Sequence, residues 1–506
     1  MFFQLVFFLS IEFKFSVVMA TYNTKNYVKQ AIESVINQTI GFENNIQLIL
    51  INDGSDDGTG DILLNYKNLY PQNIILINQD NQGQACARNN GLKYVEGEYV
   101  NFLDSDDYLS QNAFEEVYEF FSLYHEDIDV VSLPLIQFGR TNVNHILNYK
   151  FENSRVIDLK KEPNNPQLHV ASSFVKKSAI NNILFPLNIV ASEDSNFINK
   201  IILKKQKLGV LNSANYFYRK RVDYSSTLDV ASSNIDYYNN RLHYHFLDLI
   251  NYSIAIFGFV PKFIQYTLIY DLYWLVNGAN LDIFMDSDEK NDFFSTFDEI
   301  LKFIDEDVIW NNRNLKYSLL KKFLYYYKVK NYSIIPSNEV RFMVGDKQFD
   351  KLSYHSFWIN HVEIRDESLY INGFLNTHFN LNSISVSLTK EDENGHINEY
   401  VANYIEKNNH VAFLSTIWQF NYNFEAYVPL DHVNSKIKLF VNYHIDNDPT
   451  NFDEKNVISH SLKVGFKDSS CISKECNYFI SDLFLIAFQN KIFHILYNSC
   501  KGIIKF

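Results

Sequence analysis

Short apolar runs alternate with amphipathic segments between residues 14 and 110, and this alternation constrains the fold more than any other feature of the chain. Several runs have the composition of strands buried on both faces of a sheet: residues 15–20, 46–51, 74–77 and 99–103. Segments with helical patterns lie between them: residues 27–37, 62–69 and 85–94. Such a series implies a mostly parallel sheet with helices on both faces, so we predict an α/β domain over residues 14–230.

The rest of the chain divides into regions with other patterns. Residues 231–335 are mainly helical and aromatic in character, which predicts a helical linker. Between residues 350 and 466, apolar Ile384, Val386 and Leu388 alternate with polar residues, and Asn372-Gly373 is a hairpin-turn signal. This pattern predicts an antiparallel β-sandwich. The two ends of the chain are apolar segments without a clear pattern: residues 1–13 and 467–506.

Charge and cysteine content argue against some classes of protein. The net charge of −14 speaks against a general nucleic-acid-binding protein. The four cysteines have no zinc-ligand spacing and are too few for a disulfide framework, which fits a reducing cytoplasm. The apolar stretch 254–276 is broken by Pro261, Lys262 and Asp271, which favours buried helix over a membrane span. We therefore expect a cytoplasmic protein that contacts the inner face of the membrane at most peripherally.

An acidic cluster, Asp104-Ser105-Asp106-Asp107, directly follows the last of these predicted strands. In open α/β sheets, ligands bind at the carboxyl ends of the strands. Carboxylates at positions i and i+2 can converge on one hard cation where the backbone turns. Mg²⁺ or Mn²⁺ with diphosphate oxygens would then complete an oxygen-rich shell. The alternative is an acidic turn that caps a helix beginning near Ala113.

Further motifs lie at the ends of the earlier strands or at adjoining helix starts. They read V-V-M-A-T-Y-N at residues 17–23, L-I-L-I-N-D-G-S-D-D-G-T at 48–59 and N-Q-G-Q-A-C-A-R-N-N-G at 81–91. Together with D-S-D-D they form an ordered set that resembles the family 2 glycosyltransferases, which have the Rossmann-like GT-A fold. The resemblance covers residues 14–225. It implies an enzyme that moves a sugar from a nucleotide-diphosphate donor to a hydroxyl group with the help of Mn²⁺ or Mg²⁺.

The resemblance also assigns roles around the donor. Tyr22 can pack its ring against the base. Asp53 would accept the uracil imide N–H, although it could instead cap a helix. Arg88 could reach the diphosphate with its planar fork of donors, or it could be an ordinary surface arginine. The implied donor contacts are Thr21, Tyr22, Asn23, Asp53, Arg88, Asp104 and Ser105, with Asp106 as the metal ligand.

A pair of acidic residues, Glu193-Asp194, stands before a helical run that continues through Ile202. Family 2 enzymes have an E-D pair at about this distance after the D-x-D motif, and the resemblance makes Asp194 the general base of an inverting transfer. Glu193 would position this base or the acceptor. Such a base must lie on the sugar face opposite the leaving nucleotide. The alternative is that Ser192 caps the helix and the acidic residues favour its dipole.

Residues 216–227 read Y-F-Y-R-K-R-V-D-Y-S-S-T. In family 2 relatives a similar loop closes over the donor phosphates, which makes Arg219 and Arg221 candidate phosphate contacts and Ser226 a further polar contact. The alternative is a solvated basic loop. Several relatives have a histidine here as an extra metal ligand, and this sequence has none between Tyr216 and Thr227, which puts metal coordination by the loop in doubt.

The order of domains resembles glycosyltransferases that build or decorate wall teichoic acids, in which the C-terminal part mediates self-association. The resemblance therefore implies a UDP-sugar donor, a polymeric or lipid-linked glycan or polyol-phosphate acceptor, and a homo-oligomer formed through the C-terminal domain. One alternative is a noncatalytic carbohydrate-binding or scaffold protein on a GT-A fold. Another makes the β-sandwich a carbohydrate-binding module, if Trp358 and Trp418 are exposed and coplanar.

Overall fold

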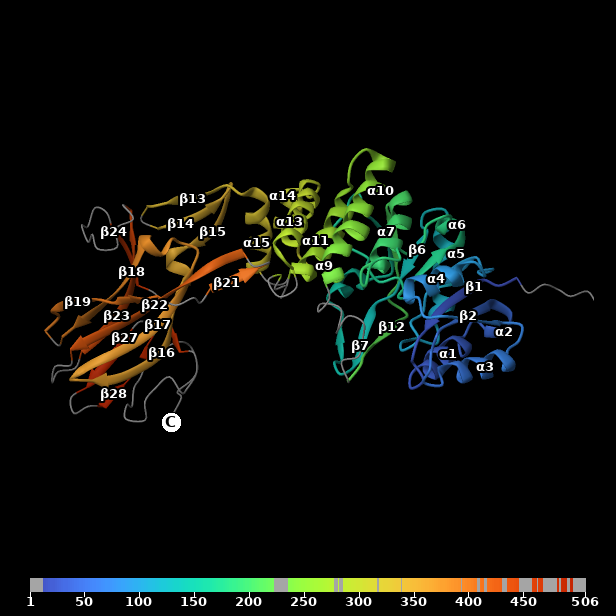
Figure 1. Ribbon diagram of the computed structural model, residues 1–506, viewed down its shortest axis with the longest axis horizontal. Coiled ribbons are helices and arrows are strands. Elements are labelled where there is room, and N and C mark those ends of the chain that lie inside the picture. The colour runs from blue at the N-terminus through green and yellow to red at the C-terminus, as the bar shows by residue number, and fades with distance from the viewer. Residues whose placement is uncertain are drawn as a thin grey trace, which may run out of the picture. The chain divides into compact units, whose positions relative to one another are not determined.

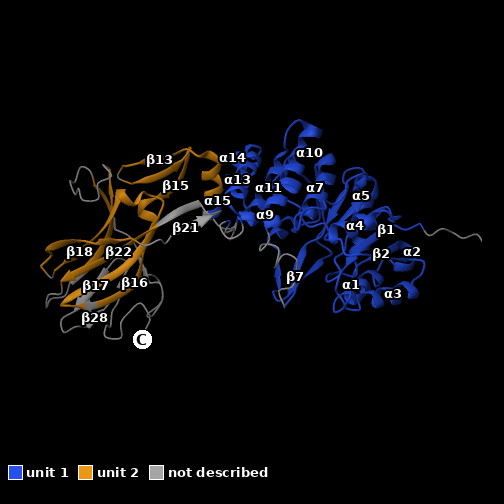
Figure 2. Cartoon of the chain, viewed as in Figure 1, with its two compact units in different colours: residues 1–321 blue, residues 322–506 orange. Residues whose placement is uncertain are grey.

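The computed structural model separates the chain into two compact units, residues 1–321 and 322–506 (Figure 2). The description below covers residues 12–222, 235–276, 281, 285–315, 318–337, 339–392, 394–406, 410–413, 416–429, 435–445, 457–461, 463–466, 480–481, 484–488 and 492–494. Ser226 and the terminal residues 1–11 and 495–506 lie outside these ranges.

The centre of the first unit is a sheet whose strands lie in the order β3-β2-β1-β4-β10-β6-β11-β9. Its strands are β1 (Phe15–Thr21), β2 (Ile46–Asp53), β3 (Ile74–Gln79), β4 (Tyr99–Asn101), β6 (Val130–Ser132), β9 (Arg155–Asp158), β10 (Ser173–Lys176) and β11 (Lys207–Val210). Figure 1 labels β1, β2 and β6 of this sheet. Strands β1 to β4 pair in parallel, whereas β10 runs antiparallel between β4 and β6. The predicted mostly parallel α/β sheet is confirmed.

Helices cover both faces of this sheet. The faces carrying Phe15 and Leu48 pack against α1 (Val28–Ile36), α3 (Thr59–Leu69) and α5 (Ala113–Tyr124) in one apolar core. The opposite face meets α4 (Gln84–Leu92), where an added Cβ on Gly91 would lie 2.5 Å from the Val18 side chain. The glycine of the A-R-N-N-G motif thus allows α4 to lie close to β1.

A smaller sheet stands beside the first, with the strand order β5-β12-β7-β8. Its members are β5 (Tyr108–Leu109), β7 (Leu135–Gly139), β8 (Val143–Asn144) and β12 (Tyr216–Lys220). Strand β5 begins directly after the D-S-D-D motif, and β12 pairs with it through Tyr216 and Phe217. The pairing brings the R-K-R segment next to the acidic cluster, although more than a hundred residues separate them in the chain.

The helical region of the first unit follows α7 (Glu193–Lys205). Its members are α9 (Ile235–Arg241), the π-helix η2 (Leu242–Leu247), α10 (Asp248–Phe257), α11 (Lys262–Val276), α13 (Ser287–Lys302), α14 (Glu306–Trp310) and α15 (Ser318–Val329), which reaches into the second unit. Helix α10 packs against α7. Almost every residue of α11 is buried. Within the described part of the chain, no helix is both long and apolar enough to cross a bilayer.

The described part of the second unit consists of mainly antiparallel sheets, with β25 parallel to β16 as the exception, which confirms the predicted fold class. A short sheet, β13 (Tyr332–Ile335), β14 (Arg341–Val344) and β15 (Lys347–Lys351), precedes the larger ones. Residues 332–335 are therefore strand, and the helical region ends at Val329 rather than at residue 335. The alternating pattern of Y-S-I-I, which lies next to Pro336, accounts for this difference.

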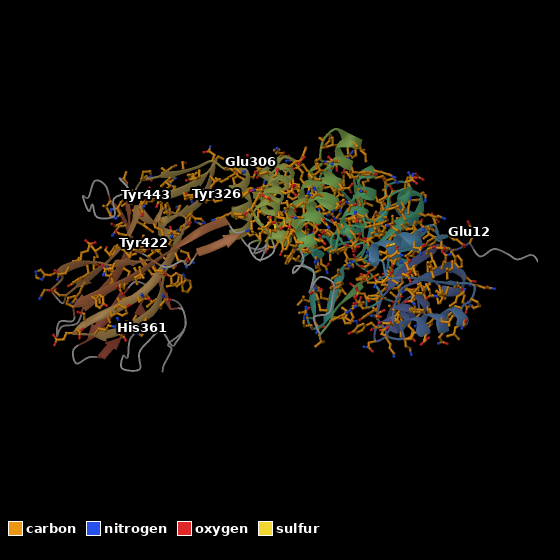
Figure 3. All side chains as sticks on the ribbon, viewed as in Figure 1. Glu12, Glu306, Tyr326, His361, Tyr422 and Tyr443 are labelled. Carbon is orange, nitrogen blue, oxygen red and sulfur yellow. The ribbon has the colours of Figure 1, made fainter. Side chains whose placement is uncertain are left out.

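Two larger sheets carry most of the second unit. One contains β16 (Ser356–Arg365), β17 (Ser368–Thr377), β20 (Asn403–Ile405), β22 (Thr416–Pro429) and β25 (Lys463–Phe466) in the order β20-β22-β17-β16-β25. The other contains β18 (Ile384–Glu391), β19 (Ile397–Val401) and β23 (Ser435–His444). Tyr422 and Tyr443, one from each sheet, are both buried (Figure 3). Trp358 is 41% exposed on β16, and the side chain of Trp418 lies outside the described part.

Candidate active site

The carboxyl ends of adjacent strands β2, β1 and β4 bring the predicted donor residues to one edge of the sheet. Thr21 ends β1, and its hydroxyl donates to the Ile51 carbonyl at 2.9 Å. Tyr22 follows and is half exposed, as a ring that meets a nucleotide base would be. Asn23 has φ +50° and accepts a hydrogen bond from the Asp56 N–H at 3.0 Å, which ties this turn to the loop after β2.

Asp53, at the end of β2, is buried and holds the loop that leads into α4. One carboxylate oxygen accepts from the Gln82 N–H at 2.9 Å and from the Gln79 side chain at 2.8 Å, and the other accepts from the Gly83 N–H at 2.9 Å. Asp53 therefore does not cap α3, whose N-cap residue is Gly58. Its carboxylate ties the end of β2 to the loop that precedes α4.

Arg88 of α4 is the electrostatic centre of the site. Its side chain is only 2% exposed, and its guanidinium contacts Asp104 at 2.7 Å, Asp194 at 2.5 Å and Glu193 at 3.6 Å. The surface-arginine alternative is therefore wrong, because burial of a charge requires partners of opposite sign. The guanidinium joins the D-S-D-D motif to the E-D pair.

The acidic residues around Arg88 titrate unusually because they share a buried space. Burial raises the pKa of Asp104 against the opposing effect of Arg88. Burial and the neighbouring Asp194 charge raise the pKa of Glu193 to about 8, although Arg88 acts in the other direction. The raised pKa of Glu193 lies in the range in which a carboxyl group can exchange a proton near neutral pH, a property found in groups that handle protons in catalysis.

Asp107, to which the motif alone assigns no role, anchors the acidic loop to the smaller sheet. Its carboxylate accepts from the Tyr216 hydroxyl at 2.6 Å and from the Arg219 N–H at 2.6 Å. Burial, together with the charges of Asp106 and Asp104, raises the pKa of Asp107. Ser105 is buried in the same turn. The third aspartate of the motif thus holds the loop, and its pattern in the sequence did not distinguish this role.

Arg219, which belongs to β12, and Arg221, which directly follows this strand, contact Asp106 through different atoms. Arg219 donates from Nε to the Asp106 carbonyl at 2.7 Å and from Nη2 to Gln30 at 2.5 Å, and its guanidinium lies over the Phe138 ring. Arg221 donates from Nε and Nη2 to one oxygen of the Asp106 carboxylate, both at 2.8 Å. The solvated-loop alternative does not hold for these two residues, because both are fixed to the acidic loop.

Glu193 and Asp194 occupy the first turn of α7. Ser192 before them has φ +75°, a left-handed conformation that costs a non-glycine residue energy and is found most often where function requires it. Its side chain makes no capping hydrogen bond, so the proposed Ser192 cap is not formed. Asp194 accepts from Arg88 through one oxygen and from the Val170 N–H at 3.1 Å through the other.

His169 is a site residue that sequence reasoning missed. Its Nδ1 accepts from the Ser172 N–H at 3.1 Å, its Nε2 lies 3.9 Å from Asp104, and its ring packs edge-on against Tyr216. Burial is the main cause that lowers the pKa of His169 and keeps the ring neutral. It belongs to no recognisable motif, and only its position between two motifs that meet in space identifies it.

The residues present fit a divalent cation that has further ligands from outside the chain. Asp106 supplies a hard carboxylate oxygen, and Asp104 lies two residues before it. Among the described residues, no group of three or more His, Cys, Asp or Glu side chains could hold a metal ion without further ligands. Mg²⁺ is commonly bound through one or two carboxylates together with substrate phosphates, and this donor set matches that pattern.

Comparison with known proteins gives this geometry a context. Residues 16–184 match the family model described as glycosyl transferase family 2. The chain is 38% identical over 378 residues to the minor teichoic acid biosynthesis protein GgaB of Bacillus subtilis, covering 73% of this chain and 42% of that protein. It is 35% identical over 302 residues to GgaA of the same organism, covering 58% of this chain and 68% of that protein.

A solved structure supports the fold assignment. Staphylococcus aureus TarS 1–349, crystallised in complex with UDP-GlcNAc, superposes with a TM-score of 0.50 over 67% of this chain and 99% of that chain. The two sequences are 20% identical in the aligned region, so this likeness concerns the fold.

Proposed function

The chain belongs to glycosyl transferase family 2, and on that premise we propose that it is an inverting transferase that moves a sugar from a UDP-sugar to a hydroxyl group of a cell-envelope polymer. The observation that carries this proposal is the buried cluster around Arg88. There the D-S-D-D motif, which faces the donor, and the E-D pair, which would face the acceptor, share one cation. A noncatalytic scaffold would have no need to keep such a costly set of buried charges.

The donor half of the site is built from the ends of β1, β2 and β4. The half-exposed Tyr22 ring offers an apolar surface to the base, and Asp53 fixes the loop next to it. Asp106, with Asp104, would hold Mn²⁺ or Mg²⁺, which when bound neutralises charge on a departing diphosphate. Arg221 is already beside Asp106 and can turn toward a phosphate oxygen. The UDP-GlcNAc complex of TarS supports a uridine nucleotide as the donor carrier.

The acceptor half of the site is the first turn of α7. In an inverting transfer the acceptor hydroxyl oxygen attacks the anomeric carbon from the face opposite the nucleotide, and a carboxylate takes the hydroxyl proton. The Glu193–Asp194 pair provides that carboxylate, with Asp194 the base that the family resemblance implies. Arg88 keeps both groups at a fixed position relative to Asp104.

The acceptor class comes from the relatives. GgaB and GgaA are named as minor teichoic acid biosynthesis proteins, and a 31% identical relative from Bacillus spizizenii is a poly(ribitol-phosphate) beta-glucosyltransferase. We extend a polymeric or lipid-linked acceptor to this chain, at the inner face of the membrane. The antiparallel sheets of the second unit would then assemble copies of the protein or hold a long acceptor.

A donor panel tests the proposal. Purified protein is incubated with each UDP-sugar, with Mn²⁺, Mg²⁺ or chelator, and nucleotide release is measured with and without a polyol-phosphate acceptor. We expect release with one sugar class and strong loss in the Asp106→Asn variant. Asp127→Asn, which alters a surface ion pair with Lys207, serves as the control. Donor binding without turnover under every condition would support the scaffold alternative instead.

A further inference from the structure

One face of the smaller sheet carries basic side chains. Side chains alternate between the two faces along a strand, so Tyr216, Tyr218 and Lys220 of β12 share one face. Arg219, a candidate donor contact, lies on the opposite face. The His169 ring packs edge-on against the rings of Tyr216 and Tyr218, with centroids 5.0 and 5.8 Å apart, which places it over the first face. The Lys220 ammonium lies 4.9 Å from the centroid of the Tyr218 ring.

His145 belongs to the same face. It directly follows β8, and its N–H donates to the Leu135 carbonyl at 3.1 Å, which extends the pairing of β8 with β7. Strand β7 lies beside β12, with Leu135 opposite Tyr216 (Figure 1). Paired residues of neighbouring strands present their side chains on one face of a sheet. The result is a basic face that consists of Tyr218, Lys220, His145 and His169.

A buried cation near this face has only neutral partners. Lys150, in the 3-10 helix η1 (Ile146–Phe151), is 4% exposed. Its ammonium donates to the Pro166 carbonyl at 2.6 Å and to the Gln167 side-chain oxygen at 2.7 Å. Burial lowers the pKa of Lys150 to about 7, and no carboxylate among the described residues opposes this shift. Because buried charges are normally paired, the positive charge here calls for an anion from outside.

The two histidines of the basic face both offer a hydrogen-bond donor. Nδ1 of His145 accepts from the Leu147 N–H at 3.3 Å, and Nδ1 of His169 accepts from the Ser172 N–H at 3.1 Å. Each neutral ring therefore carries its proton on Nε2. The His169 Nε2 lies 3.9 Å from Asp104, which is longer than a hydrogen bond. Both Nε2 donors can thus turn to a ligand.

The basic groups also act against one another. Burial is the main cause that lowers the pKa of His145 to about 4, and the nearby charges of Lys150, His169 and Lys220 act in the same direction. Like charges at close range repel, and an anion between them removes that cost. A phosphate group in particular accepts several charge-assisted hydrogen bonds at once. The basic face thus has the donors and the charge that a phosphate requires.

The basic face adjoins the acceptor half of the site. His169 is followed by Val170, whose N–H donates to Asp194 at 3.1 Å. The His169 ring is 25% exposed and lies at the junction between the basic face and Asp104. A molecule that places a hydroxyl group at the start of α7 can therefore extend over His169 toward Lys220.

We infer that the basic face binds a phosphate group of the acceptor, next to the hydroxyl group that receives the sugar. This inference rests on the proposed transferase function and deepens it, because it names the contacts by which the site would prefer a polyol phosphate to a neutral glycan. The donor diphosphate has separate candidate contacts, since Arg219 lies on the opposite face of β12. A chain with a net charge of −14 repels polyanions, so a local basic face determines where such a polymer can approach.

Calorimetry on the full chain, with saturating UDP and Mg²⁺, tests the inference. The probes are glycerol 3-phosphate, a single polyol-phosphate unit, and glycerol, which lacks the phosphate. We expect binding of the first probe alone. Lys220→Gln and His145→Gln should each weaken it ~10-fold or more, because each removes a hydrogen bond to a charged group. Lys207→Gln, which alters a surface ion pair with Asp127, is the matched control and should bind as the wild type does. An unchanged midpoint of thermal unfolding shows that each variant is folded.

Other outcomes separate the inference from the function on which it depends. If the chain transfers a sugar to glycerol and to glycerol 3-phosphate with the same KM, or if both variants bind glycerol 3-phosphate as the wild type does, the inference is wrong and the transferase function stands. If UDP prevents the binding of glycerol 3-phosphate, the phosphate site belongs to the donor and the inference is also wrong. If no UDP-sugar is turned over, the proposed function fails, whereas weaker glycerol 3-phosphate binding in the two variants still supports the phosphate site.

Discussion

Replacement of Arg88 by methionine should destabilise the first unit strongly and in a pH-dependent way. The guanidinium is 2% exposed and is in contact with carboxylates of Asp104, Asp194 and Glu193. Methionine fills a similar volume but leaves these buried groups without a cation. Removal of one partner from a buried ion pair costs ~3–5 kcal/mol, so we expect a loss of that size in the free energy of unfolding at about pH 8.

The sign of the pH effect follows from the direction of the pKa shifts. Burial already raises the pKa of Asp104, and it raises that of Glu193 to about 8 while Arg88 opposes the shift. Without Arg88 both values rise further, so the folded variant binds more protons than the unfolded chain above about pH 4. Stability must then fall as pH rises through that window. The variant should be closest to the wild type at about pH 5 and furthest from it at about pH 9.

Hydrogen exchange of peptides from α4 and α7 in rising urea reports on this unit separately from the other. The control is Arg155→Met, which removes a two-bond contact to Glu162 at 2.6 and 2.7 Å between side chains that are 40% and 46% exposed. Exposed pairs contribute ~0–1 kcal/mol, and the control should show no more. An Arg88→Met variant as stable as the control at pH 8, or equally destabilised at every pH, would refute the reasoning.

Other expectations concern packing, the acidic loop and the second unit. Gly91→Ala should lower the free energy of unfolding by ~1–3 kcal/mol, because the added Cβ would lie 2.5 Å from the Val18 side chain. Gly60→Ala should lower it less in the same urea titration, because its Cβ would meet the side-chain amide of Asn52 at 3.1 Å. Arg219→Lys should raise the donor KM ~10-fold or more, since lysine cannot reproduce two hydrogen bonds worth ~1.5–3 kcal/mol each; an unchanged KM would contradict this. A chain that ends at residue 337 should still act on short acceptors, but its activity on long polymer should fall ~10-fold or more. Equal activity of this shortened chain on short and long acceptors would exclude a role for the second unit in polymer binding.

The sequence predicted the edge of the sheet where the site lies, because parallel strands bring their carboxyl ends together. Thr21, Asp53 and Asp104 each follow a run of buried apolar residues, and that pattern is local. The fold class of both units follows from the same kind of pattern. The sequence did not predict that β10 pairs antiparallel between β4 and β6, because S-F-V-K has no feature that distinguishes parallel from antiparallel pairing.

The partners of individual side chains could not be read from the sequence. Arg88 meets Asp194 across 106 positions, and Arg219 meets Gln30 across 189, so these contacts depend on the completed fold. The motif around Arg88 was compatible with a diphosphate contact, and only the position of α7 shows that carboxylates surround it. His169 has no motif at all, and it enters the site because β10 and the loop before it fold back toward Tyr216.

The insertion of β10 has a consequence for how the protein is made. Strands β4 and β6 are synthesised first, but they are neighbours only through β10, whose residues 173–176 emerge from the ribosome later. Until then a nascent chain exposes two unpaired strand edges in the middle of its largest sheet, and such edges attract other chains. Fragments that stop before residue 173 should therefore aggregate, and the sheet is complete only after β11 at residues 207–210 has also been made.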